Sequence, residues 1–270
     1  MNTNMFASLA NQVAEQEDQT KAVATERRVI PAGLTLARMI EYVELGLQPQ
    51  KDYKGKKKAD CEEVRIAFEL CKPDNTYIDS AGMERRDVIS CRIAKKLSSK
   101  AKFFKLMKKM SRGRAEIKHM AQMLGEAFIV EIFHNDVEKD GKTITYANLF
   151  DSESSCNICA PFQQDLITGE TKAIPVPEPK EQLRMFLWSN PTKECWNSIF
   201  IDGTYTIKEA SGAEREVSKN WMQETLRSST AFSGSALEAM LMQMYAAEGG
   251  LPPIEDGHFP SEMTTDEVPF

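Results

Sequence analysis

The sequence of 270 residues lacks the features that would place it in a membrane or among the common enzyme classes. No apolar run approaches the roughly 18 residues that span a bilayer, and the first twenty residues are polar and acidic, unlike an export signal. There is no phosphate-binding GxxxxGK[ST] loop, no HExxH and no GxSxG, and the three histidines, at 119, 134 and 258, lie far apart. We therefore expect a cytoplasmic protein that is not an enzyme.

Lysine and arginine are absent after Arg227, where seven acids remain, and the net charge of the whole chain is -6. The basic residues are concentrated in two stretches that come earlier in the chain. Between residues 85 and 118, thirteen Lys or Arg stand against two acids, and the sequence "KDYKGKKK" at 51–58 holds five lysines. The net charge of the whole chain does not show how charge is distributed along it. The negative sign of the net charge therefore says little about which partners the protein binds. The pattern predicts a basic body followed by an acidic tail.

Alternating apolar residues predict strands over much of the region 29–150. Strands are expected at 34–47, 62–70, 87–94, 127–134 and 143–150, and helices at 98–112 and 115–125. The alternation breaks near Glu41, which favours a bulge. In the second strand the apolar side chains share one face and Arg65 lies on the other, while Arg92 points outward from the third strand.

These elements follow the order strand, basic hairpin, strand, strand, helix and final hairpin. That is the order of an OB-type barrel, a five-stranded barrel whose helix lies between its third and fourth strands. We expect a mainly β (α+β) fold: an OB-type five-stranded barrel with inserted helices and a helical C-terminal extension. The expected divisions are a flexible arm at 1–28, a nucleic-acid-binding core at 29–150, an extension with a short strand and helices packing on the core at 151–250, and a disordered acidic tail at 251–270.

The six cysteines are scattered, and we expect them to be reduced thiols. Only Cys156 and Cys159 form a pair, and two intervening residues let both thiolates reach one tetrahedral zinc ion. Because the chain has no second paired motif, we predict no metal ion and no other cofactor. Zinc bound by Cys156 and Cys159 is the alternative.

The basic residues are the strongest indication of function. A lysine-rich helix is often only a solvated face. Here, however, the cations occupy both a strand-connecting loop and the helix of one predicted barrel, and nucleic-acid phosphates need such a row of cations, as unstacked bases need exposed aromatic faces. The predicted phosphate contacts are Lys51, Lys54, Lys56, Lys57, Lys58, Arg65, Arg92, Lys95 and Lys96, extended by Lys100, Lys102, Lys105, Lys108 and Lys109, and the predicted stacking residues are Tyr53, Phe133 and Tyr146.

The chain ends in "TTDEVPF", where Asp266, Glu267, Val268, Pro269 and Phe270 place acids directly before an aromatic residue with a free carboxylate. Such an end can enter an apolar pocket rimmed by Arg or Lys. It resembles the acidic tip of bacterial single-stranded DNA-binding proteins. The body is similar to bacteriophage single-stranded DNA-binding proteins with an OB fold, through "IPAGLTLARMIEYVELGLQPQKDYKGKKK", "EEVRIAFEL", "LGEAFIVEIFHNDVEKDGKTITYANL" and "FLWSNPTKECWNSI".

This resemblance implies a protein that coats single-stranded DNA without sequence specificity during phage replication, recombination or repair, in the host cell cytoplasm. It also implies that the tip recruits a replication or recombination protein such as a polymerase, a helicase or a recombinase. Only two acids directly precede Val268, fewer than in that family. The alternative is a non-enzymatic protein-interaction factor whose basic surface binds an acidic host or phage protein.

Overall fold

The computed structural model describes residues 28–52, 55–79, 82–139, 141–165, 167–208 and 214–248 of the chain. Its fold is mainly β, as predicted, and is built around one large antiparallel sheet. The long strands of this sheet are β1 (Gly33–Gln48), β2 (Cys61–Leu70), β5 (Val88–Ala94), β6 (Ala127–Lys139) and β7 (Lys142–Asn148). No helix within the described ranges is long and apolar enough to cross a membrane.

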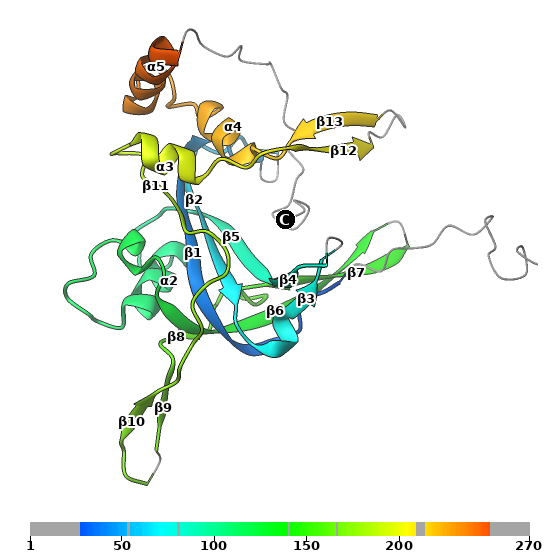
Figure 1. Cartoon of the computed structure of the whole chain (residues 1–270), viewed down its shortest axis with the longest axis vertical. Coiled ribbons are helices and arrows are strands. Elements are labelled where there is room, and N and C mark those ends of the chain that lie inside the picture. Colours follow the sequence, from blue (N-terminus) through cyan, green and yellow to red (C-terminus); the bar gives the residue numbers. More distant parts are fainter. Residues whose placement is uncertain are drawn as a thin grey trace, which may run out of the picture.

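The first strand, β1, runs through the whole sheet and curves strongly (Figure 1). Its first half pairs with β6 and its second half with β2, both antiparallel. The register with β2 shifts between Met39 and Glu41 and again between Glu44 and Gly46. Such irregularities bend a strand. The bulge predicted near Glu41 is therefore confirmed, and bending lets one strand serve two neighbours.

The long strands follow the order β5-β2-β1-β6-β7 across the sheet. Numbered among themselves along the chain, they stand in the order third, second, first, fourth, fifth. The outer strands β5 and β7 approach each other, although no ladder joins them in the described part of the chain. Two short strands complete the sheet: β8 (Ile158–Cys159) pairs with β6, and β11 (Arg184–Phe186) lies parallel to β1.

The inner faces of the long strands enclose the main apolar core. The helix α2 (Lys102–Ser111) contributes Phe103, Leu106 and Met110 to it, so the helix predicted at 98–112 forms with slightly shorter bounds. The helix predicted at 115–125 is wrong, because only a 3-10 turn, η2 (Met120–Met123), forms there. Hydrogen bonds between His119 and Gln122 close that single turn, and nucleating a longer helix is costly.

A second apolar core joins the C-terminal half to the outer side of β1. Val43 and Leu45 of β1 pack there with side chains such as Phe186 and Trp196. The helices around this core are α3 (Lys193–Ser198), α4 (Trp221–Arg227) and α5 (Ala236–Glu248), beside the hairpin of β12 (Thr204–Lys208) and β13 (Glu214–Ser218). Figure 1 shows this group above the main sheet. The predicted extension helices are confirmed, whereas the hairpin was not predicted.

Two further hairpins extend from the body. One joins β3 (Thr76–Ile78) to β4 (Glu84–Arg86), after the 3-10 turn η1 (Pro73–Asn75). The other joins β9 (Phe162–Gln164) to β10 (Thr171–Ala173) and projects downward in Figure 1. All six strand residues of the latter hairpin are exposed. No hairpin is predicted there from the sequence, because such short strands show almost no alternation.

Gly46 fixes the contact between β1 and the C-terminal half. Its backbone has a φ of +76°, and a Cβ atom added there would lie 2.4 Å from Cζ3 of Trp188. We expect Gly46→Ala to lower the free energy of unfolding by about 2–4 kcal/mol, through backbone strain and overpacking. Chemical denaturation measures this loss. Gly234→Ala is the matched control, since Gly234 has the same φ and open space around it; equal losses in the two variants would contradict the packing argument.

Candidate nucleic-acid interface

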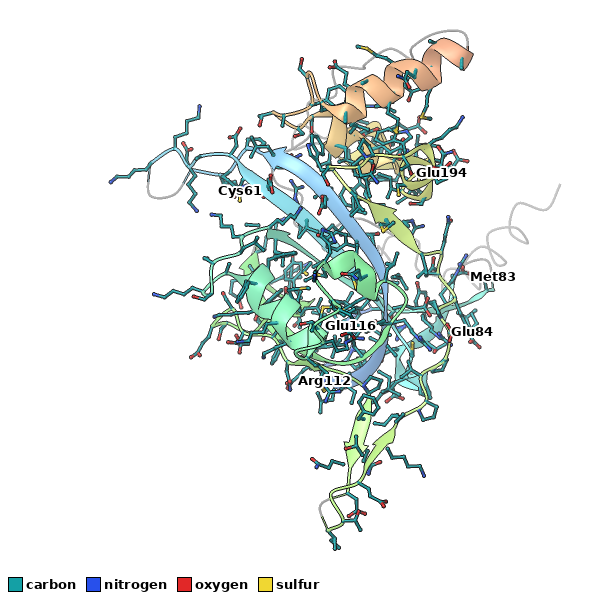
Figure 2. The ribbon with its side chains drawn as sticks, turned by 90° about the vertical axis from the view of Figure 1, so that its left-hand side faces the viewer. Cys61, Met83, Glu84, Arg112, Glu116 and Glu194 are labelled. Carbon is teal, nitrogen blue, oxygen red and sulfur yellow. The ribbon has the colours of Figure 1, made fainter. Side chains whose placement is uncertain are left out.

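The loop between β1 and β2 presents lysines to solvent. Lys51, Lys56, Lys57 and Lys58 are all exposed. Two predicted contact residues, Tyr53 and Lys54, lie outside the described residues. Figure 2 shows that the loop leading to Cys61 extends outward above α2, whose end is marked by Arg112.

The residues that follow β5 lie against the base of this loop. The Lys95 N–H donates to the Glu62 carbonyl over 2.7 Å. Burial raises the pKa of the Cys61 thiol, and the nearby Lys96 ammonium opposes that rise. The β2–β5 ladder therefore brings two basic stretches together that are separate in the sequence. We call this surface the basic rim: Lys51, Lys56, Lys57, Lys58, Lys96 and Lys100.

Most of the basic rim carries uncompensated charge. Within the described ranges, no carboxylate forms an ion pair with Lys51, Lys56, Lys57, Lys96 or Lys100. All five side chains are exposed. Clustered cations without protein partners attract a polyanion and release its counterions when it binds. The rim therefore has the electrostatic character that a phosphate backbone requires.

The lysines of α2 divide into two groups. Lys102 and Lys109 turn towards residues 150–156: the Lys102 Nζ lies 4.9 Å from the centre of the Phe150 ring, and Lys109 donates to the Cys156 carbonyl. All four lysines of α2 are exposed, but Lys105 and Lys108 have no such contact. The helix thus adds Lys105 and Lys108 as cations without such a contact in the described part of the chain, while Lys100, which precedes the helix, belongs to the basic rim.

Arg65 does not belong to this surface, so the prediction that it contacts phosphate is wrong. Only 2% of Arg65 is exposed, its Nε donates to Glu41 over 2.5 Å, and its guanidinium lies 4.9 Å from the Trp221 ring centre. The face of β2 predicted to be open is covered by the C-terminal half. Arg92 does point outward as predicted, but it forms an ion pair with Glu63.

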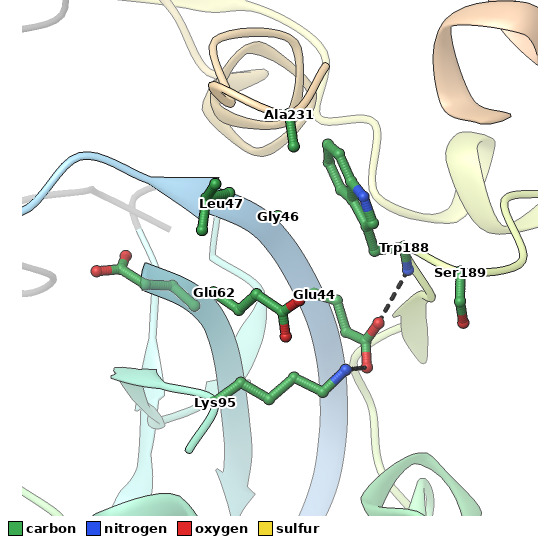
Figure 3. Close-up of a pocket in the computed structure, with 9 residues that line it drawn as sticks. Glu44, Gly46, Leu47, Glu62, Lys95, Trp188, Ser189 and Ala231 are labelled. Carbon is green, nitrogen blue, oxygen red and sulfur yellow. Dashed lines mark hydrogen bonds and ion pairs between the residues drawn. The ribbon is translucent and has the colours of Figure 1, made fainter. Parts of the chain in front are cut away.

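Lys95 lines a hollow of about 180 Å³ between the strand ends and Trp188 (Figure 3). Its ammonium lies 2.5 Å from one oxygen of Glu44, whose other oxygen accepts the Trp188 N–H over 2.9 Å. Burial would raise the pKa of Glu44. The Lys95 ammonium, the backbone N–H of Trp188 and the Tyr42 hydroxyl together hold this pKa below its usual value. Lys95 is therefore held in a structural ion pair with Glu44 of β1, and Glu44 in turn joins β1 to the C-terminal half through Trp188.

The predicted stacking residues Phe133 and Tyr146 lie together on the β6–β7 hairpin. In the ladder Phe133 is opposite Asn148 and Tyr146 is opposite Asn135, so the two aromatic side chains are diagonal neighbours on one face. Both are partly buried. In Figure 1 α2 lies at one end of the main sheet, and the β6–β7 hairpin extends from the other end. The structure thus brings the two aromatics together, but apart from the lysines of α2.

The two cysteines of the alternative zinc site differ in their surroundings. Cys156 is buried in the main core, while Cys159 is exposed. Burial raises the pKa of the Cys156 thiol, which disfavours the thiolate that zinc requires. Among the described residues, no cluster of three or more His, Cys, Asp or Glu could hold a metal ion.

One exposed residue of this region was not predicted. Leu97 is 73% exposed and follows Lys96 directly. A single aliphatic residue inside "KKLSSK" is the only signal that the sequence offers for it. The tip residues Asp266, Glu267, Val268, Pro269 and Phe270 lie outside the described residues.

Comparisons with known proteins found no match for this chain. Neither a protein-family model, nor a curated protein, nor a solved structure matches the chain.

Proposed function

We propose that the protein binds single-stranded DNA without sequence preference and coats it during phage replication or recombination. The observation that carries the proposal is the basic rim, whose exposed lysines come from two separate segments. Five of them, Lys51, Lys56, Lys57, Lys96 and Lys100, form no ion pair with a carboxylate in the described part of the chain. Cations that follow a backbone bind every sequence equally, since phosphates carry no base information. Flexible lysine side chains also suit a strand of irregular shape.

The strand order supports an OB-type barrel as the framework of this function. In such a barrel the first strand pairs with the second and fourth, and the helix lies between the third and fourth strands. Here β1 pairs with β2 and β6, and α2 lies between β5 and β6. The approach of β5 to β7 is the contact through which the barrel would close. The loop that carries Lys56 and Lys57 joins the first two strands, a position where OB folds bind oligonucleotides.

The acidic tip is the proposed attachment point for a polymerase, a helicase or a recombinase. Five acids lie between residues 251 and 270, and no lysine or arginine accompanies them. Tethered to a body with an open basic rim, they compete with DNA for it at low salt. Deleting 251–270 should therefore raise the affinity for oligo-dT at low salt, by on the order of several-fold, and abolish partner binding. Fluorescence anisotropy checks the first effect; weaker DNA binding after deletion would contradict the competition.

The proposed function is tested by direct competition between nucleic-acid forms. A labelled oligo-dT strand is bound to the full chain and then challenged with unlabelled single strand or unlabelled duplex. The expected result is displacement by single strand at a much lower concentration than by duplex. Absence of binding to any strand, with retention of an acidic protein from the host or phage, would instead favour a protein-interaction factor.

A further inference from the structure

Leu97 exposes its side chain in the middle of the basic surface. It lies between Lys96 and Lys100, directly after the segment that contacts the base of the β1–β2 loop. With 73% of its surface accessible, it is more exposed than Leu34 at 55% or Leu183 at 40%. It lies between two short hydrogen-bonded turns, in which the Lys96 N–H donates to the Ala94 carbonyl and the Ala101 N–H donates to the Ser98 carbonyl.

A partner that covers this surface must offer both negative charge and apolar area. Single-stranded nucleic acid has both, since its phosphates alternate with bases that can unstack and expose their apolar faces without breaking base pairs. Leucine is one of the side chains that proteins insert between bases. Building on the proposed function, we propose that Leu97 packs between adjacent bases of the bound strand while Lys96 and Lys100 contact the phosphates on either side. A duplex, whose bases are already stacked, offers no such contact without distortion.

An anionic membrane surface also combines charge with apolar area, but the structure favours nucleic acid. Membrane-surface helices present a broad apolar face to the lipid. The apolar side chains Phe103, Leu106 and Met110 of α2 are buried in the main core instead. Within the described residues of the basic loop and of the segment 95–101, Leu97 is the one exposed large apolar side chain, which fits the space between two bases better than a lipid interface.

The test compares Leu97→Ser with the matched control Leu34→Ser in the full-length chain. Leu97→Ser should weaken binding to oligo-dT about five- to tenfold, because a leucine loses most of its buried apolar area. The slope of log affinity against log salt should stay unchanged, since no charge is altered. Lys100→Ala should instead lower that slope by about 0.7. Leu97→Met should retain affinity, and Leu34→Ser should bind as the unaltered chain does.

The outcomes separate this inference from the proposed function. If the unaltered chain does not bind oligo-dT, the proposed function fails. If it binds and Leu97→Ser binds equally well, or if Leu34→Ser loses as much affinity, only the role of Leu97 is overturned. Binding to vesicles rich in anionic lipid that is lost in Leu97→Ser, with strand binding retained, would also overturn it. Thermal unfolding provides the control for folding. Both serine variants should unfold at the same midpoint temperature as the unaltered chain, which shows that the fold is intact.

Discussion

Replacing Lys56 and Lys96 together by alanine is expected to weaken oligo-dT binding on the order of tenfold or more at 0.1 M salt. Each side chain belongs to a different segment of the basic rim, and each is exposed. Losing two phosphate contacts should lower the slope of log affinity against log salt by about 1.4, because each contact with a single strand contributes about 0.7. Fluorescence anisotropy over a series of salt concentrations measures both quantities.

The matched control removes the same charge elsewhere. Lys142 at the start of β7 and Lys172 in β10 are also exposed, but neither lies on the basic rim. The Lys142→Ala, Lys172→Ala variant should keep the salt slope of the unaltered chain. If both double variants lose the same affinity and slope, binding depends on net charge alone, and the basic rim is not the interface.

Glu41→Gln is expected to lower the free energy of unfolding by roughly 3–5 kcal/mol, the largest stability effect that we predict. The Glu41 carboxylate and the Arg65 guanidinium form an ion pair in which both side chains are 3% exposed. Removing the carboxylate leaves a buried positive charge without its partner, and Nη1 of Arg65 already lacks a hydrogen-bond acceptor among the described residues. Urea unfolding measures the loss.

Glu63→Gln provides the comparison, because it breaks the more exposed pair with Arg92 by the same chemical change. Its expected cost is at most about 1 kcal/mol. Replacing both buried partners, as in Glu41→Leu with Arg65→Met, should recover most of the lost stability, since no isolated charge remains. Similar costs for Glu41→Gln and Glu63→Gln would show that the buried pair has no special role.

Local alternation was enough to predict most of the main sheet. The strands at 62–70 and 87–94 alternate regularly, and the structure forms β2 and β5 there. Even the irregularity at Glu41 corresponds to a register shift. Hairpins with strands of three to five residues, such as β3–β4 and β12–β13, were missed, because so few residues do not establish a period.

The prediction failed for Arg65 because alternation shows which side chains share a face, not what covers that face. Trp221 covers Arg65, and the N–H groups of Lys180 and Glu181 donate to Glu69 on the same strand. These partners come more than a hundred residues later in the chain. No pattern in the sequence around β2 predicts these later partners.

The residue types of the candidate interface could be predicted from the sequence, but not which of these residues lie together in the fold. The lysine clusters at 51–58 and 95–100 are visible in the sequence, whereas the ladder that brings them together is a contact between distant residues. The same holds for Phe133 and Tyr146, which the β6–β7 ladder places as diagonal neighbours on one face of their hairpin. A role for Leu97 could be inferred only after the structure showed that its side chain is exposed.

The central claim, that the basic rim binds the backbone of single-stranded DNA, is tested most directly by the salt dependence of oligo-dT binding to the full chain. Occupancy of four or five phosphates by the rim lysines predicts a slope of log affinity against log salt of about -3. Affinity should therefore fall about eightfold for each doubling of the salt concentration. An affinity that does not change with salt would contradict the account.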